Sequence, residues 1–246
     1  MKIPKTYRGK DVEQGYEDYL KKQEQQPIPQ PTLITPANIN NPQNYIILPS
    51  NIYCPKDLLI AKHLSHLNKT WEQCQEALQK DNHFMLPLRQ FIDFLTLLQT
   101  NNVYDGSGSK LSRQECKNIF NDITEVRNHY HAELLDAQYS KQGKDLMISY
   151  AKVQPDGSLL RTKEPLEACL MTNKTPGISL EDWLNNPTSQ GLPRENVPKG
   201  SLYYWHPIEG RVSGFGAGSG GVVLGCDVVP RVSDAVLGTR AARVKT

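Results

Sequence analysis

The chain lacks the residue patterns that mark a metal site, a redox centre or a membrane span. Its cysteines are odd in number and widely spaced, and no two form a Cys-x-x-Cys pair, so neither a zinc site nor a redox dithiol is predicted. No apolar run approaches the roughly 20 residues that a membrane-spanning helix requires. The N-terminus also lacks the apolar core of a signal peptide. We therefore expect no cofactor, no membrane span and free, buried thiols at Cys54, Cys74, Cys116, Cys169 and Cys226.

Charge of one sign is not concentrated anywhere in the chain. The formal net charge is +2 at pH 7, and the longest basic run is Lys21-Lys22. The sequence therefore predicts no groove that follows phosphates and no nucleic-acid partner. A nucleophile elbow (Gly-x-Ser-x-Gly) and a phosphate-binding loop are both missing, and the histidines have no acidic partner at metal-ligand spacing. The protein is accordingly not expected to be an enzyme.

Residues 1–55 are polar and rich in proline. Prolines at this density exclude helix interiors, so the segment is predicted to be an extended arm. One short strand is expected within it, over residues 45–48. The arm is either flexible or packed on the rest of the protein, and the strand-like patch favours packing. The prolines are Pro27, Pro29, Pro31, Pro36, Pro42 and Pro49.

From residue 55 to about 138 the apolar residues recur with the period of a helix. The pattern predicts helices over 58–67 and 88–98, and two more that begin behind Thr70 and Ser112. Both of these residues start a capping box, Thr-x-x-Gln and Ser-x-x-Glu, which marks a helix N-terminus. The helix behind Ser112 is expected to be long and to bury Ile119, Ile123, Val126, Tyr130 and Leu134.

After Gly143 the pattern changes to that of strands. Residues 146–153 and 158–160 flank the turn Pro155-Asp156-Gly157, which is typical of a β-hairpin. A short helical turn is expected over 180–184, and strands and turns follow from Ser201. The sequence thus predicts an α+β fold with an extended N-terminal arm, a helical N-terminal portion and a C-terminal part made of strands.

The segment richest in glycine has an ordered pattern. Eight of the chain's 17 glycines fall between Gly210 and Gly238, and many of them alternate with larger residues. Successive side chains of a strand point to opposite faces, so one face is predicted to pack on a core. A one-residue shift at Gly221 is needed to keep the alternation in phase. The core face then carries Phe215, Ala217, Val222, Leu224 and Cys226, and the other face is almost entirely glycine, valine and aspartate.

A strand face made of glycine requires an explanation other than stability. Glycine inside a strand costs conformational entropy and contributes no packing. Codons for Gly, Val, Asp, Ser and Arg all arise from the asparagine codon AAC when its adenines are replaced, whereas codons that end in C never encode Lys, Glu, Gln, Met or Trp. None of those latter types occurs between Val212 and Thr239, although Lys, Glu and Gln are common elsewhere. Replacement of adenines in the gene would account for this composition.

Four short patterns in this segment carry a resemblance to a known family. They are Tyr203-Tyr204-Trp205-His206-Pro207, Val212-x-x-Phe215-x-Ala217, Leu224-x-Cys226-x-x-x-Pro230 and Leu237-Gly238-Thr239-Arg240-Ala241-Ala242-Arg243. Together they resemble the variable region of proteins diversified by retroelements, of the archaeal and archaeal-virus type. The last pattern also resembles the terminal strand of C-type lectin domains related to the formylglycine-generating enzyme. The match covers about 40 residues and is weaker over residues 55–200.

The resemblance implies a C-type-lectin-like domain over residues 56–246, with residues 203–243 as its diversified variable region. Such a domain would bind varied macromolecular or cell-surface ligands and would be cytoplasmic or associated with a virion. The residues expected to form the scaffold are Phe215, Ala217, Leu224, Cys226, Pro230, Leu237 and Gly238. The residues expected to be displayed are His206, Gly214, Gly216, Gly218, Gly220, Gly221, Val223, Gly225, Asp227, Val228, Val229, Val232 and Asp234.

Other interpretations have weaker support in the sequence. Gly216-x-Gly218-x-x-Gly221 matches the dinucleotide fingerprint, but strand and turn are predicted after it where that motif needs a helix. Glu164-Pro165-Leu166 lacks the amide oxygen of the calcium motif of sugar-binding C-type lectins. Two alternative functions stay open: an enzyme of the formylglycine-generating type that uses Cys226 or a metal, and a viral structural or assembly protein that uses its arm. The display face also departs from most binders, which carry Tyr, Trp or Arg anchors.

Overall fold

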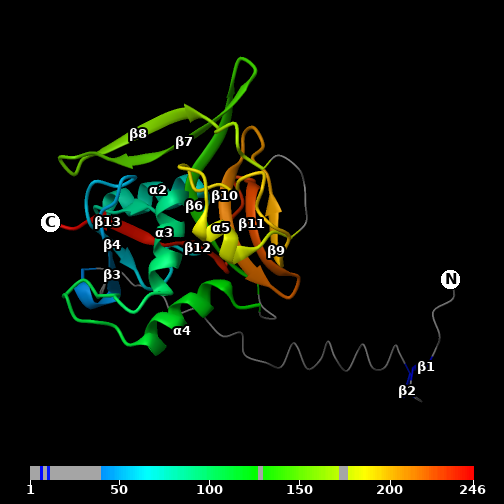
Figure 1. Cartoon of the computed structure of the whole chain (residues 1–246), viewed down its shortest axis with the longest axis horizontal. Helices are drawn as coiled ribbons and strands as arrows, with labels where there is room; N and C mark the ends of the chain where they lie inside the picture. The colour runs from blue at the N-terminus through cyan, green and yellow to red at the C-terminus, as the bar shows by residue number, and fades with distance from the viewer. Residues whose placement is uncertain (1–5, 8–9, 12–39, 127–129, 172–176) are drawn as a thin grey trace. The chain divides into compact units, whose positions relative to one another are not determined.

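The structure, a computed structural model, describes residues 6–7, 10–11, 40–126, 130–171 and 177–246. The chain divides into two compact units, residues 1–31 and residues 32–246. In the first unit, β1 (Thr6–Tyr7) pairs antiparallel with β2 (Lys10–Asp11). The remaining elements belong to the second unit, which is mixed α+β as the sequence predicts (Figure 1). The prolines predicted to extend the arm over residues 27–36 lie outside the described residues.

The larger sheet of the second unit has seven strands. Six follow the order β8-β7-β6-β10-β11-β9, and β12 pairs with β6 beside this path. The pairs β9–β11 and β12–β6 are parallel, and the other pairs are antiparallel. The strands are β6 (His131–Gln142), β7 (Asp145–Val153), β8 (Leu159–Pro165), β9 (Leu202–Trp205), β10 (Val212–Gly218), β11 (Gly221–Val228) and β12 (Leu237–Thr239).

The smaller sheet joins segments from distant parts of the sequence. Its strands are β3 (Tyr45–Leu48), β4 (Leu58–Ala61), β13 (Ala241–Val244) and β5 (Phe84–Met85), in that order. The strand predicted at residues 45–48 is confirmed, and its residues Tyr45 and Ile46 are fully buried. Residues 45–48 are therefore part of the folded unit.

Four α-helices occur among the described residues: α2 (Trp71–Lys80), α3 (Leu88–Leu98), α4 (Arg113–Thr124) and α5 (Leu180–Asn185), with a short 3-10 helix, η1 (Pro42–Asn44). Both predicted capping boxes are formed. The Thr70 hydroxyl accepts a hydrogen bond from the Gln73 N–H, and the Ser112 hydroxyl accepts one from the Glu115 N–H. Every helix of the described part is too short or too polar to cross a lipid bilayer.

Two helix predictions are wrong. Residues 58–61 form β4 and not a helix, because all four side chains are buried between neighbouring strands and His66 and Asn68 take positive φ values of 55° and 56°, which end any helical path. The helix behind Ser112 ends at Thr124. Tyr130 precedes β6 and Leu134 lies on it, and both Val126 and Tyr130 are about half exposed. Burial of Ile119 and Ile123 on α4 is confirmed.

One hairpin and one short helix follow the sequence signals, and a second hairpin replaces a predicted irregularity. β7 and β8 form the predicted hairpin, with Gly157 at φ 89° in its turn. Ser179 caps α5 as expected. The one-residue shift inferred at Gly221 is instead a hairpin turn, because Gly218 and Gly221 are cross-strand partners joined by Ser219 and Gly220.

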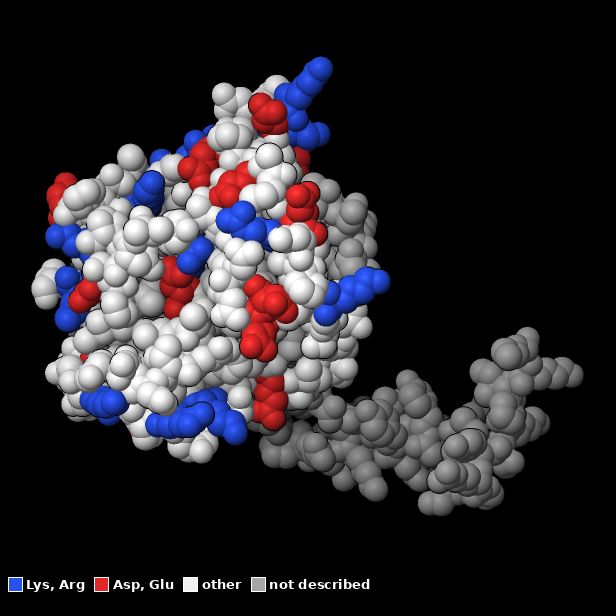
Figure 2. All heavy atoms as spheres, in the orientation of Figure 1, with Lys and Arg blue, Asp and Glu red and all other residues white. Residues whose placement is uncertain are grey.

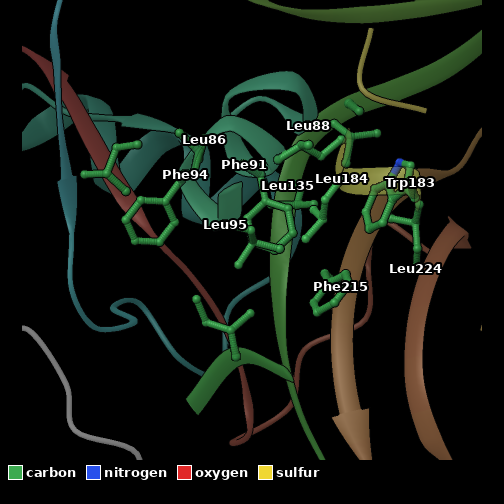
Figure 3. Close-up of a cluster of buried hydrophobic side chains, with 14 of the residues drawn as sticks. Leu86, Leu88, Phe91, Phe94, Leu95, Leu135, Trp183, Leu184, Phe215 and Leu224 are labelled. Carbon is green, nitrogen blue, oxygen red and sulfur yellow. The ribbon is translucent and has the colours of Figure 1, made fainter. Parts of the chain in front are cut away.

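The main core lies on one face of the larger sheet, under α3 and α5. Figure 3 shows Phe91, Trp183 and Phe215 gathered there from α3, α5 and β10. The ring centroids of Phe91 and Phe215 are 5.1 Å apart, and those of Trp183 and Phe215 are 6.2 Å apart. Burial of one such aromatic side chain contributes about 1.5–3 kcal/mol. A second cluster, which includes Trp71, Leu134 and Leu237, fills the space beside the smaller sheet.

Candidate functional site

The hairpin of β10 and β11 sets which side chains face the core. Its two-residue turn places Gly216 opposite Val223 and Gly218 opposite Gly221. Residues 214, 216 and 218 therefore share a face with residues 221, 223 and 225. Phe215, Ala217, Leu224 and Cys226 point to the other face and are at most 1% exposed. The inward face is the one that the alternation predicts.

The remaining scaffold residues also hold the segment in place. Leu237 and Gly238 are buried, and Pro230 is half-buried. The Pro230 carbonyl accepts a hydrogen bond of 3.0 Å from the Trp71 N–H at the start of α2. A Cβ at Gly238 would stand 2.5 Å from Leu67 Cδ2 and 2.9 Å from the Ser65 carbonyl oxygen, so no larger residue fits there.

The opposite face is less open than the sequence suggests. Gly214, Gly216, Gly218 and Gly225 are buried, so the prediction that these four face solvent is wrong. Tyr130 covers two of them. A Cβ at Gly216 would lie 2.6 Å from the Tyr130 hydroxyl oxygen, and one at Gly218 would lie 3.0 Å from its Cδ2. These glycines therefore allow the tyrosine ring to lie directly on the backbone of β10.

Gly214 and Gly225 are enclosed by their own strand and its neighbours. A Cβ at Gly214 would lie 3.3 Å from Val228 Cγ2, and one at Gly225 would lie 3.3 Å from Asp227 Oδ1. Val228 itself is partly exposed and packs against the second core cluster. These three residues therefore contribute to the packing of this face, and Gly214 and Gly225 are not among its solvent-exposed positions.

A subset of the predicted display residues is open to solvent. Gly220, Val229, Val232 and Asp234 are exposed, and Val223 and Asp227 are partly exposed. A Cβ at Gly220 would have no neighbour within 4 Å, so any side chain fits there. Gly221 is partly exposed, but its φ of 123° favours glycine, and Tyr203 Cε2 would be 2.8 Å from its Cβ.

The loop between β11 and β12 has fixed ends. The Asp234 carbonyl accepts a hydrogen bond of 3.0 Å from the Asn68 N–H, and its side chain accepts one of 3.0 Å from the Val236 N–H. Together with the contact between Pro230 and Trp71, these bonds hold the loop against the segment before α2. Val229 and Val232 are thus presented from an anchored loop.

His206 lies apart from the other predicted display residues. It lines a separate pocket of about 310 Å³ together with Lys144, Glu167 and Met171. Its Nδ1 atom is buried and has no hydrogen-bond partner among the described residues. His206 and the glycine face therefore lie in different pockets, and the structure does not bring them together.

The residues that sequence reasoning missed are aromatic. A shallow pocket of about 290 Å³ is lined by Tyr130, Tyr203, Trp205, Gly218, Ser219, Gly220, Gly221 and Val223. Tyr203 and Trp205 are each 41% exposed. The residues that alternate with them along β9, Leu202 and Tyr204, are buried. The alternation of Leu202 to Trp205 along β9 is a signal that could have identified them. β9 lies parallel to β11, which places Tyr203 beside Val223 and Trp205 beside Gly225.

The chemistry of this region opposes a catalytic role for Cys226. Its thiol is fully buried, and burial raises its pKa to about 11. The Ser213 hydroxyl lies 3.5 Å from Cys226 Sγ and 2.7 Å from the Tyr139 hydroxyl, which closes the site with neutral groups. A cysteine nucleophile needs an accessible thiolate. Within the described residues, no group of three or more His, Cys, Asp or Glu side chains could hold a metal ion.

No protein-family model, curated protein or solved structure matches the chain.

Proposed function

We propose that the protein is a ligand-binding protein that displays a variable surface on the open side of β9, β10 and β11, and that a retroelement diversifies this surface. A C-type-lectin-like architecture for residues 56–246 belongs to the same proposal. The observation that carries it is a division of roles within one hairpin. Phe215 and Leu224 are buried in the core, whereas Gly220 and Val223 on the other side border an open pocket.

This division would let side chains change without unfolding the protein. Substitutions on an exposed surface usually change stability by less than about 0.5 kcal/mol. The positions that meet this condition are Gly220, Val223, Asp227, Val229, Val232 and Asp234. In this proposal Gly214, Gly216, Gly218 and Gly225 shape the floor of the surface and vary less.

The aromatic residues supply the anchors that the glycine face itself lacks. Binding energy at protein surfaces is concentrated in a few residues, most often Trp, Tyr and Arg. Tyr203 and Trp205 lie beside the variable positions on the same face of the sheet. We propose that they give general affinity and that the neighbouring variable residues give specificity. The ligand would be a protein or a cell-surface molecule.

The charges on the viewed surface are mixed, so they do not indicate a partner that carries charge of one sign only. Figure 2 shows Lys and Arg interspersed with Asp and Glu over the viewed face. The described residues that line the pocket are instead uncharged, namely aromatic, glycine, serine and valine residues. Shape and aromatic contact would therefore dominate recognition.

The gene's surroundings give the direct test. A near-identical repeat beside a reverse transcriptase gene is expected, with AAC or AAT codons at the six open positions. Differences between the repeat and the gene should be confined to those adenines and should spare the codons of Phe215 and Leu224. A neighbourhood with no such repeat, or differences spread evenly over buried and open positions, would overturn the diversification.

A display library tests the binding surface without knowledge of the natural ligand. The six open positions would be randomised, and the library panned against a purified test protein such as lysozyme. Specific binders are expected that keep the stability of the parent protein. The matched control library randomises Val212, Phe215 and Leu224, which are buried. Recovery of folded binders from the control library at the same rate would contradict the proposal.

A further inference from the structure

The pocket over the glycine floor has the features of a cage for a positively charged group. We propose that Tyr130, Tyr203 and Trp205 bind an organic cation of the quaternary or methylated ammonium class. This deepens the proposed function, on which it rests, because it names the chemistry of a ligand group that the same surface would hold. A cation is attracted to the face of an aromatic ring by the ring's quadrupole.

The walls of the pocket come from three segments of the larger sheet. Tyr203 and Trp205 project from the same face of β9, about 7 Å apart along the strand. Tyr130 lies over Gly216 and Gly218 of β10. The ring of Tyr203 lies against Gly221 of β11, so the two tyrosine rings rest over neighbouring strands, whose spacing is about 4.8 Å. Within the described residues these three rings make no stacked or tilted contact with one another, and all three line one pocket.

The floor of the pocket is made by glycines that leave room for the two tyrosine rings. Gly218 and Gly221 are cross-strand partners at the end of the hairpin. A Cβ at Gly218 would be 3.0 Å from the ring of Tyr130, and one at Gly221 would be 2.8 Å from the ring of Tyr203. Side chains at these two positions would collide with the rings and displace them from the walls of the pocket. These glycines therefore let the two tyrosine rings lie against the hairpin, although glycine weakens a strand.

The charges around the pocket favour a cation. Among the described residues that line the pocket there is no Lys, Arg, Asp or Glu. Asp227 Oδ1 comes within 3.3 Å of the Cβ position of Gly225, which is the cross-strand neighbour of Trp205. Within the described residues, neither Asp227 nor Asp234 forms an ion pair. Two carboxylates that form no ion pair in the described part of the chain therefore belong to this surface.

Asp234 acts at the Tyr130 end of the pocket. Burial raises the pKa of the Tyr130 hydroxyl, and the negative charge of Asp234 raises it further. A carboxylate close enough to disfavour a phenolate also favours a cation at the same place. A sugar is a weaker match, because it needs several hydrogen-bond donors and acceptors, and among the described lining residues only Ser219 has an aliphatic hydroxyl.

A pair of isosteres distinguishes a cation from an apolar ligand. The full chain would be titrated with choline and with 3,3-dimethyl-1-butanol, which has the same shape without the charge. Tryptophan fluorescence reports binding, because Trp205 is 41% exposed whereas Trp71 and Trp183 are buried. Choline is expected to bind about tenfold more tightly than the alcohol. Isothermal titration calorimetry checks the affinity independently.

Two substitutions of one residue separate the ring from its hydroxyl. Tyr203→Phe keeps an aromatic face and is expected to bind choline as the parent does. Tyr203→Leu removes that face and should weaken binding about tenfold. Tyr203 is exposed, so both variants should unfold at the same urea concentration as the parent, and the fluorescence readout at Trp205 is kept. Leu160→Ala, at an exposed apolar residue of β8 outside the pocket, is the matched control and should leave choline affinity unchanged.

The outcomes distinguish this inference from the proposed function. Preference for choline, lost in Tyr203→Leu and kept in Tyr203→Phe, supports the cage. Equal affinity for the two isosteres, or no binding of choline at millimolar concentration, overturns it. Either negative result leaves the diversified surface to be judged by the repeat in the gene's surroundings and by the display library.

Discussion

Arg240 and Glu133 form an ion pair inside the protein, with Arg240 Nε 3.0 Å from Glu133 Oε2 and side chains only 1% and 3% exposed. Arg240 also donates hydrogen bonds to the carbonyl oxygens of Ala61, at 2.9 Å, and Lys62, at 2.6 Å. Glu133 lies on β6 of the larger sheet, and Ala61 ends β4 of the smaller one. One guanidinium between β12 and β13 thus connects the two sheets.

Removal of one partner of this pair should be costly. Arg240→Met leaves the Glu133 carboxylate buried without its cation, so we expect a loss of about 3–5 kcal/mol in the free energy of unfolding. The double variant with Glu133→Leu should recover a large part of that loss, because no isolated charge remains. Urea denaturation at pH 7 measures both. The control is Lys245→Met, which breaks an exposed pair with Asp57 and should cost less than about 1 kcal/mol.

Substitution of a glycine on β10 should destabilise the protein much more than substitution of Gly220 in the hairpin turn. Gly216→Ala would place a Cβ 2.9 Å from Ala132 Cβ and 2.6 Å from the Tyr130 hydroxyl, so it is expected to destabilise the protein by about 1–3 kcal/mol. Gly220→Ala meets no neighbour within 4 Å and should change stability by less than about 0.5 kcal/mol. Thermal unfolding of both variants decides this.

Combining Gly216→Ala with Tyr130→Ala tests whether the two residues are in contact. If the tyrosine ring is what excludes a side chain at Gly216, the double variant Gly216→Ala, Tyr130→Ala should cost less than the sum of the single changes. Strict additivity of the two changes would show that Tyr130 does not rest on β10 in solution.

His83 should make the protein less stable in mild acid. Its ring is buried, with Nδ1 2.6 Å from the Asp81 carbonyl oxygen and Nε2 2.9 Å from the Tyr45 hydroxyl, an arrangement that suits the neutral form. Burial lowers the pKa of His83 below its ordinary value near 6.5. The unfolded chain therefore takes up a proton near pH 6.5 that the folded chain refuses, so stability is complete above this pH and falls as the pH decreases through it.

The histidine effect can be separated from that of the carboxylates by its pH range. Burial also lowers the pKa values of His63 and His66, so all three act in the same direction. Urea denaturation at pH 5, 6, 7 and 8 should show stability rising with pH, by up to about 1.4 kcal/mol per pH unit for each proton. His83→Gln should reduce the slope. An unchanged slope in this variant would exclude His83 as a source.

Thiol reagents should distinguish the five free cysteines. Cys169 is half-buried, and the other four are buried. Burial raises the pKa of Cys226 and of Cys74 to about 11, so both carry almost no thiolate at pH 8. We expect a disulfide reagent to modify Cys169 first in the folded protein and the others only in urea. Loss of the fast phase in Cys169→Ser checks the assignment, and fast labelling of Cys226 would reopen the enzymatic alternative.

Local signals in the sequence identify local structure well. The capping boxes at Thr70 and Ser112 and the glycine of the β7–β8 turn each lie within a few residues of the structure that they predict. Residues 58–61 mislead because a run of four buried apolar residues looks the same in a buried strand and in a buried helix. Here the distant strands β3 and β13 decide, since they flank β4.

The candidate site shows the same limit. The alternation along β10 and β11 predicts that Phe215 and Leu224 face the core, because the direction of a strand side chain depends only on its position in the strand. It does not predict what lies on the other face. Tyr130 covers Gly216 from a segment far away in the sequence, and β9 brings Trp205 beside Gly225 through a parallel pairing that no turn signal announces.

The position of β13 has a consequence for any process that rewrites the segment before it. β13 lies between β4 and β5 in the smaller sheet, and it follows residues 203–240 in the chain. A premature stop codon or a shifted reading frame within those residues would remove the strand on which β4 and β5 both depend. Defective copies would then be eliminated by misfolding and proteolysis, so that only intact copies would accumulate.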